Sequence, residues 1–156
     1  MTQQSPALLR ILLVEDDRIQ GMVITKMLEK HGYTVVHHID PRDAVAALES
    51  DDFDIIISDY VMPEMDGLQL LRRARILRPD AVRIMLTGKG NFDLAVKAIN
   101  KGEIYRFMTK PVEEGEMVTS LRLATERLEL TRENALLREE LRKRDELIAK
   151  LREGDA

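Results

Sequence analysis

The stretch Ile55-Ile56-Ile57-Ser58-Asp59 decides the fold of this chain. A short run of β-branched apolar residues is typical of a strand buried on both faces of a parallel sheet. Ligands of open α/β sheets bind just beyond the carboxyl ends of such strands. Asp59 therefore stands where a functional carboxylate is expected, although taken alone it could equally be a loop residue that caps a turn.

Four further apolar runs flank this one and predict strands at 8–14, 33–38, 82–86 and 104–108. Helix patterns alternate with these runs. Capping residues indicate where the helices start: Asp17 with Gln20, Asp40 before Pro41, Asp66 with Gln69, and Asn91. The last helix starts near Glu113. Such alternation predicts a parallel sheet with helices on both faces. The expected fold class is α/β, a flavodoxin-like doubly wound (βα)5 sheet with strand order 2-1-3-4-5.

The composition of the chain disfavours several classes of function. The 156 residues leave room for one domain and a short appendage, and the net charge of −4 disfavours direct nucleic-acid binding. The chain has no cysteine and therefore no thiolate metal site, and no apolar run reaches the length of a membrane span. Residues 1–7 are polar and predict a flexible N-terminus that is not a signal peptide, so we expect a cytoplasmic protein.

Polar side chains follow four of the predicted strands: Glu15 and Asp16 the first, Asp59 the third, Thr87 the fourth and Lys110 the fifth. In the expected strand order these four strands are neighbours, so the side chains meet at one edge of the sheet. Three carboxylates favour a hard cation, and oxygen ligands without His or Cys suit Mg²⁺ or Mn²⁺. A carboxylate can also accept a phosphoryl group, which a lysine and a hydroxyl could contact.

These motifs resemble the receiver domain of two-component response regulators of the chemotaxis-regulator type. The resemblance rests on Val14-Glu15-Asp16-Asp17, on 59–67, on Thr87-Gly88 and on Lys110-Pro111, and it covers residues 8–128. The stretch 100–107 is also similar to receivers that precede HD-type phosphodiesterase domains.

The resemblance implies that Asp59 accepts a phosphoryl group from a histidine kinase or a phosphotransfer protein. It implies that Mg²⁺ is held by Asp16, Asp59 and the backbone carbonyl of Val61, with Glu15 acting through a water molecule. Thr87, Gly88 and Lys110 would surround the phosphoryl group, with Val61 and Lys89 flanking the access path. It further implies a cis peptide at Lys110-Pro111 and a switch that couples Thr87 to Phe107.

The implied output is an unknown downstream protein that binds the surface of helix four, strand five and helix five. The implied chemistry is limited to the chain's own phosphorylation and dephosphorylation. A Mg²⁺-dependent phosphohydrolase is a different class, but enzymes that resemble the haloacid dehalogenase family carry a second Asp where this chain has Val61. His31, His37 and His38 are expected to be structural or surface residues.

The last helix is predicted to continue to Glu153, because no Gly or Pro occurs from Glu116 until Gly154. Its first turns would face the sheet through residues 117, 118, 121, 124 and 128. Beyond them, heptad spacing predicts the seam of a parallel two-stranded coiled coil, formed by Leu130, Asn134, Leu137, Leu141, Ile148 and Leu151. Arg144 fits this seam poorly, so a solvated charged helix or a helix that docks another protein stays open.

We therefore expect a flexible N-terminus (1–7), a receiver domain (8–128), a coiled-coil extension that forms a homodimer (129–153) and a tail (154–156). Two alternatives remain at this point. The chain could be a constitutive coiled-coil dimerisation or adaptor module with a receiver-like head, or the N-terminal part of a longer regulator.

Overall fold

The computed structural model describes residues 9–154, and the predicted flexible N-terminus and residues 155–156 of the tail lie outside this range. Five parallel strands form one sheet in the order β2-β1-β3-β4-β5. The strands are β1 (Arg10–Val14), β2 (Thr34–His38), β3 (Ile55–Asp59), β4 (Val82–Thr87) and β5 (Arg106–Thr109). This arrangement confirms the predicted fold class.

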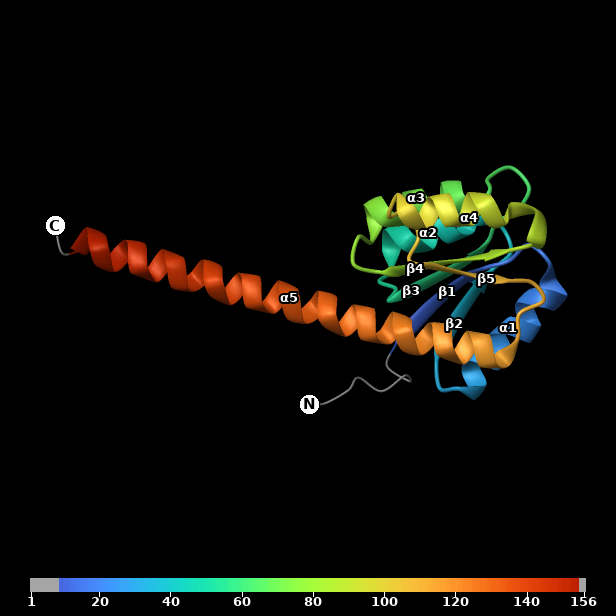
Figure 1. The fold of residues 1–156 in the computed structure, drawn as a ribbon, viewed down its shortest axis with the longest axis horizontal. Helices are drawn as coiled ribbons and strands as arrows, with labels where there is room; N and C mark the ends of the chain where they lie inside the picture. The colour runs from blue at the N-terminus through green and yellow to red at the C-terminus, as the bar shows by residue number, and fades with distance from the viewer. Residues whose placement is uncertain (1–8, 155–156) are drawn as a thin grey trace.

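Helices cover both faces of the sheet (Figure 1). One face carries α1 (Arg18–Lys30) and α5 (Glu114–Gly154), and the other carries α2 (Pro41–Ser50), α3 (Gly67–Leu77) and α4 (Phe92–Asn100). A short 3-10 turn, η2 (Lys89–Asn91), joins β4 to α4.

The central strand β3 explains the apolar run from which the fold was predicted. Ile55 and Ile57 pack in the hydrophobic cluster shared with α1 and α5, whereas Ile56 packs in the cluster shared with α2, α3 and α4. All three side chains are fully buried. The strand has no solvent face, and for this reason its sequence does not alternate between polar and apolar residues.

Two details of the predicted elements differ in the structure. Asn91 is the N-cap residue of α4, as expected, but its side chain makes no capping hydrogen bond. Strand β5 was expected to begin at residue 104. It begins at Arg106 because the backbone N–H of Ile104 still bonds to the carbonyl of Ala98 at the end of α4, at 3.4 Å.

Helix α5 packs on the sheet through its first turns and then leaves the head. Met117, Leu121, Ala124 and Leu128 are buried as predicted. Val118 was expected to face the sheet as well, but it is 39% exposed. Ser120 takes the inward position instead, and its hydroxyl accepts a hydrogen bond from Arg106 Nε at 2.9 Å.

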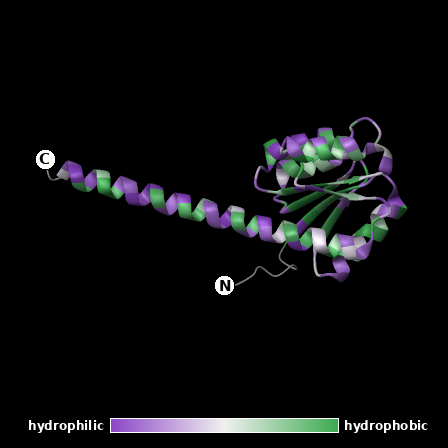
Figure 2. Cartoon of the chain, viewed as in Figure 1, coloured by the Kyte–Doolittle hydropathy of each residue, from purple (hydrophilic) through white to green (hydrophobic). Residues whose placement is uncertain are grey.

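Residues 129–154, which we call the stalk, project from the head as one continuous helix (Figure 1). No side chain of the stalk is buried, and hydrophobic and hydrophilic residues are interspersed along it (Figure 2). At its base, Arg132 forms an ion pair with Asp54, the residue before β3. Among the described residues, no helix is both long and apolar enough to cross a bilayer.

Candidate phosphoryl-acceptor site

Backbone hydrogen bonds between neighbouring strands hold the residues that follow each strand. The N–H of Glu15 donates to the carbonyl of His38 at 3.2 Å, which extends the β1–β2 ladder. The N–H of Lys110 donates to the carbonyl of Thr87 at 2.9 Å, which extends the β4–β5 ladder. Asp59 is itself the last residue of β3, paired with Leu86. The sheet therefore fixes the backbone from which these polar side chains start.

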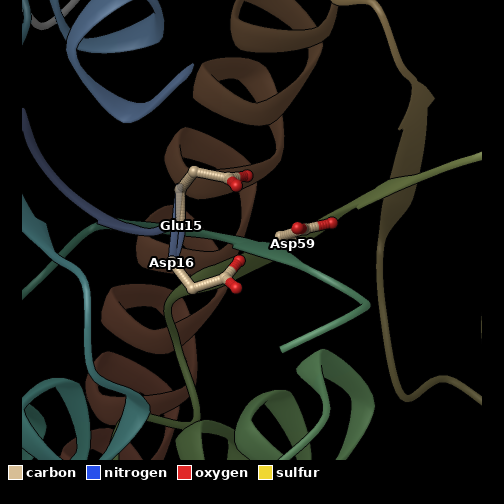
Figure 3. A group of neighbouring side chains, drawn as sticks. All are labelled: Glu15, Asp16 and Asp59. Atoms are coloured by element: carbon tan, nitrogen blue, oxygen red, sulfur yellow. The ribbon is translucent and has the colours of Figure 1, made fainter. Parts of the chain in front are cut away.

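The three carboxylates converge at this edge of the sheet. Each of Glu15, Asp16 and Asp59 has an oxygen within 4.8 Å of the others, and Figure 3 shows the side chains pointing into the same space. Glu15 and Asp59 are buried, with 1% and 5% of their surface exposed, whereas Asp16 is half-buried. The structure thus brings together the acidic residues that the sequence placed at separate strand ends.

Lys110 reaches across this group from the loop after β5. Its ammonium lies 2.8 Å from Glu15 Oε2 and 2.9 Å from Asp59 Oδ2. The peptide bond between Lys110 and Pro111 is cis, as the motif implied. One ammonium beside three carboxylates leaves two negative charges in excess, and an all-oxygen donor set with excess negative charge fits a hard divalent cation such as Mg²⁺.

The pKa values follow from burial and from these contacts. Burial raises the pKa of Glu15 above its ordinary 4.5, with Asp59 adding to the rise and Lys110 opposing it. Burial acts to lower the pKa of Lys110, but hydrogen bonds to Glu15 and Asp59 outweigh it and leave the pKa raised. Lys110 therefore stays protonated, and the negative charge of Glu15 is costly until a cation compensates it.

Thr87 closes the site on the β4 side. It is fully buried, and its hydroxyl donates to the carbonyl of Gly88 at 3.2 Å. A side-chain carbon at Gly88 would meet no atom within 4 Å, so the space beside Thr87 is open. Lys89 lies in the exposed turn η2, and Val61, after β3, is 63% exposed.

Phe107 lies on β5, two strands from Asp59. Its ring is half-buried against the core and meets Phe92, the first residue of α4, edge to face with ring centroids 5.3 Å apart. The predicted switch residue therefore bridges β5 and α4.

Two residues that contact the site escaped the sequence analysis. A side-chain carbon on Gly67 would lie 2.1 Å from the backbone oxygen of Asp59, so only glycine allows α3 to start this close to the strand. Gln20 was read only as a helix cap, but its Oε1 accepts a hydrogen bond from Lys110 at 3.0 Å. Gly67 belongs to the motif 59–67, but the motif does not show how closely this residue approaches the Asp59 backbone. The contact between Gln20 and Lys110 joins segments 90 residues apart, so no local signal identifies it.

The histidines lie outside the acidic group. His37 Nε2 is 2.9 Å from the backbone carbonyl of Glu15, and its ring packs against Gly21 of α1. His31 is paired with Glu114, at the junction of α1 and α5. His37 thus serves in packing and bonds to the backbone, and His31 contacts a carboxylate.

A doubly wound sheet that gathers three carboxylates and a lysine at the carboxyl ends of its strands defines a receiver-type signalling domain. The family profile of the response regulator receiver domain matches residues 11–122. The chain therefore belongs to the response regulator receiver family, which confirms the resemblance of its motifs, and it is the receiver domain of a two-component response regulator.

Individual proteins with similar sequences support this family assignment. The chain is 40% identical over 128 residues to the C4-dicarboxylate transport transcriptional regulatory protein DctD of Rhizobium meliloti (strain 1021), with 82% of this chain and 28% of that protein covered. It is 43% identical over 79 residues to the response regulator receiver protein CpdR of Brucella abortus (strain 2308), with 51% and 66% covered. The chain thus spans less than two thirds of the length of each.

Among solved structures, the signal receiver domain of an HD domain-containing protein from Pseudomonas fluorescens Pf-5 has a TM-score of 0.74 at 35% identity. The comparison covers 85% of this chain and 95% of that one.

Proposed function

We propose that this chain is a phosphorylation-controlled signalling switch in which Asp59 accepts a phosphoryl group from a histidine kinase or a phosphotransfer protein. The observation that carries the proposal is the convergence on Asp59 of Lys110, at 2.9 Å, and of two further carboxylates. Phosphoryl transfer needs mainly positioning and charge neutralisation, and this arrangement supplies both.

In the proposed reaction, an oxygen of the Asp59 carboxylate attacks phosphorus and forms an O–P bond. The P–N bond to the donor imidazole breaks, and its electron pair returns to the ring nitrogen. In the reaction that turns the switch off, water attacks phosphorus, the O–P bond breaks and its electron pair regenerates the Asp59 carboxylate. Both protons of the water leave with the released phosphate as H2PO4⁻.

Glu15, Asp16, Asp59 and the carbonyl of Val61 would hold Mg²⁺, with Mn²⁺ as a substitute. The ion supplies charge neutralisation for the phosphoryl oxygens. Lys110 donates hydrogen bonds to those oxygens, and its raised pKa keeps it charged for this role. Thr87 offers a hydroxyl donor, and Gly88 leaves room for the group. Val61 and Lys89 flank the access path and tune the entry of water.

The switch would act through Thr87 and Phe107. When the hydroxyl of Thr87 turns from the carbonyl of Gly88 to the phosphoryl group, it vacates space that Phe107 can fill. Because Phe107 contacts Phe92, such a movement would alter the surface of α4, β5 and α5, where a downstream protein binds.

Partner contacts have room on two exposed surfaces. Beside Lys110, a groove of about 510 Å³ is lined by apolar residues of α1, including Ile19 and Val23, and it offers a seat for the phosphoryl donor. Along the stalk, the seam residues Leu130, Asn134, Leu137, Leu141, Ile148 and Leu151 are all exposed. A helix that extends into water without packing is only marginally stable, which supports a parallel homodimer through the stalk. The proposed location of this homodimer is the cytoplasm.

A small phosphodonor such as phosphoramidate tests the acceptor. In the presence of Mg²⁺, intact-protein mass spectrometry should show one added phosphoryl group on the wild type and none on Asp59→Asn. Asp43→Asn removes an exposed carboxylate of α2 and is the matched control that should still be labelled. Labelling of Asp59→Asn equal to the wild type would overturn the site.

A further inference from the structure

The sequence motif Asp-x-x-Gln occurs at the start of two helices and behaves differently at each. At α3, Gln69 closes a reciprocal capping box: the N–H of Asp66 donates to Gln69 Oε1 at 3.0 Å, and the N–H of Gln69 donates to Asp66 Oδ1 at 2.8 Å. At α1, only half of the box forms. The N–H of Gln20 donates to Asp17 Oδ1 at 3.1 Å, but the side chain of Gln20 does not return to the backbone of Asp17.

Two site residues explain this difference. The N–H of Asp17 donates instead to Glu15 Oε1 at 3.2 Å, so the donor that would close the box is already bonded. The side-chain oxygen of Gln20 accepts from Lys110 at 3.0 Å, and its amide nitrogen lies 3.4 Å from Asp17 Oδ2. The amide is therefore oriented by donating at one end to a carboxylate and accepting at the other from the lysine.

Lys110 has as many acceptors as it has protons to give. An ammonium carries three donors, and the acceptors are Glu15 Oε2, Asp59 Oδ2 and Gln20 Oε1. A phosphoryl group on Asp59 adds three strong, charged acceptor oxygens. Lys110 can bind one of these oxygens in addition to Glu15 and Asp59 only by giving up the contact to Gln20, whose neutral amide is a weaker acceptor than the carboxylate of Glu15.

We propose that Gln20 is a positioning residue for Lys110, which it holds in the unphosphorylated site and releases when a phosphoryl group arrives. This inference rests on the proposed function of Asp59. Gln20 thereby competes with the phosphoryl group for one proton of Lys110 and lowers the affinity of the site for that group.

The variant Gln20→Met removes the acceptor and keeps a long, unbranched side chain that favours a helix. The probe is beryllofluoride with Mg²⁺, a mimic of the phosphoryl group, titrated into the full chain. Since the hydrogen bond from the Lys110 ammonium to the Gln20 amide no longer competes, we expect the affinity to rise about twofold to tenfold. Gln20→Glu replaces the amide by a charged acceptor and should lower the affinity.

Gln69→Met is the matched control. It removes the same side chain from the same helix position at α3, where the Gln69 side chain accepts its hydrogen bond from the N–H of Asp66 and not from a residue of the acidic site. This variant should lose helix stability without a rise in beryllofluoride affinity. An equal rise in both variants would overturn the inference, because the effect would then come from a lost cap.

A second measurement does not depend on phosphorylation. The ¹⁵N-labelled ammonium of Lys110 should shift in the NMR spectrum of the unphosphorylated Gln20→Met protein, since its third acceptor is gone. An unchanged Lys110 resonance, or an unchanged beryllofluoride affinity in Gln20→Met, would overturn the role of Gln20. Failure of the wild type to bind beryllofluoride at all, with the Lys110 resonance shifted by Gln20→Met, would overturn the proposed function and leave the resting contact demonstrated.

Discussion

Gly67 lies so close to the backbone of Asp59 that there is no room for a side chain at this position. We predict that Gly67→Ala lowers the free energy of unfolding by about 1–3 kcal/mol, because the added carbon would lie 2.1 Å from the Asp59 oxygen and must displace backbone. The displaced strand end should also slow labelling of Asp59. Urea denaturation and the phosphodonor assay measure the two effects.

Gly115→Ala is the control for this prediction. A side-chain carbon there would meet no atom within 4 Å, and the residue lies in the first turn of α5. Its stability should be unchanged or raised by up to about 1 kcal/mol. Equal destabilisation by the two alanines would contradict the tight contact.

Asp16 is the most exposed of the three carboxylates and the one that Lys110 does not contact in an ion pair. We predict that Mg²⁺ at about 100 times its dissociation constant stabilises the wild type by about 2.7 kcal/mol, as binding to the folded state alone requires. Thermal unfolding should show this gain, and Asp16→Asn should lose most of it. Glu49→Gln, an exposed charge loss on α2, should retain it.

Residues at strand ends could be predicted because strand order decides which ends meet. Asp59 and Lys110 lie directly after apolar runs, so a parallel sheet in the order 2-1-3-4-5 brings them together, and the structure places them 2.9 Å apart. Gln20 could not be assigned in this way. Its motif is the same as that of Gln69, but Glu15 occupies the N–H of Asp17, and Lys110, 90 residues later in the chain, binds the side-chain oxygen of Gln20.

At the level of elements, α1 and α5 are joined at one end by Glu114. Its Oε1 lies 2.9 Å from both Lys30 and His31, and hydrogen bonds from Lys30 and then His31 hold the pKa of Glu114 below its ordinary 4.5. A lowered folded pKa contributes stability that is fully present above 4.5 and is lost as the pH falls through the folded value.

We therefore predict that Glu114→Gln is less stable than the wild type at neutral pH and that the difference disappears in acid. Urea denaturation across the acid range measures this, and the effect should be small because the pair is exposed. Glu113→Gln, which removes the neighbouring charge, should show no such convergence. A constant difference at all pH values would point to a change in packing or helix propensity instead of the charge of Glu114.

The apolar pattern of a helix proved a weaker guide than that of a strand. In α1, apolar residues recur close to the helical period, yet Ile19, Met22 and Val23 are exposed, and the buried side is formed by Gly21, Ile24 and Leu28. Val118 in α5 is a similar case. A helix can carry two apolar stripes, and only tertiary packing decides which one is buried. Strand β3 is buried on both faces, so its apolar residues predict burial directly.

For the whole molecule, we predict a dimer in light scattering, with Mg²⁺ and either with or without beryllofluoride. The predicted seam lies on the stalk, away from Asp59, so beryllofluoride should leave the mass of the dimer unchanged. It should change the arrangement of the two heads, which the small-angle scattering profile reports. A dimer whose profile also stays unchanged would favour a constitutive dimerisation module. A monomer in both conditions would contradict the coiled coil.

Two leucines that are neighbours in sequence make a matched pair for this test. Leu137→Glu places a charge in the seam and should weaken the dimer by about 100-fold or more, since two apolar side chains lose their burial. Leu136→Glu changes an exposed leucine outside the seam and should leave the dimer intact. Equal dissociation by both variants would reject this seam.

The unbroken backbone of α5 has a mechanical consequence. Residues 129–154 extend roughly 39 Å from the head at about 1.5 Å per residue. The helix is anchored where Leu128 is buried and where Arg132 pairs with Asp54, so this junction is its fulcrum. A tilt of about 10° there would carry the far end by about 7 Å, which follows from the same helical rise. A small shift beside Asp59 that tilted α5 would therefore move the far end of the stalk by several ångströms, and a longer helix would move farther.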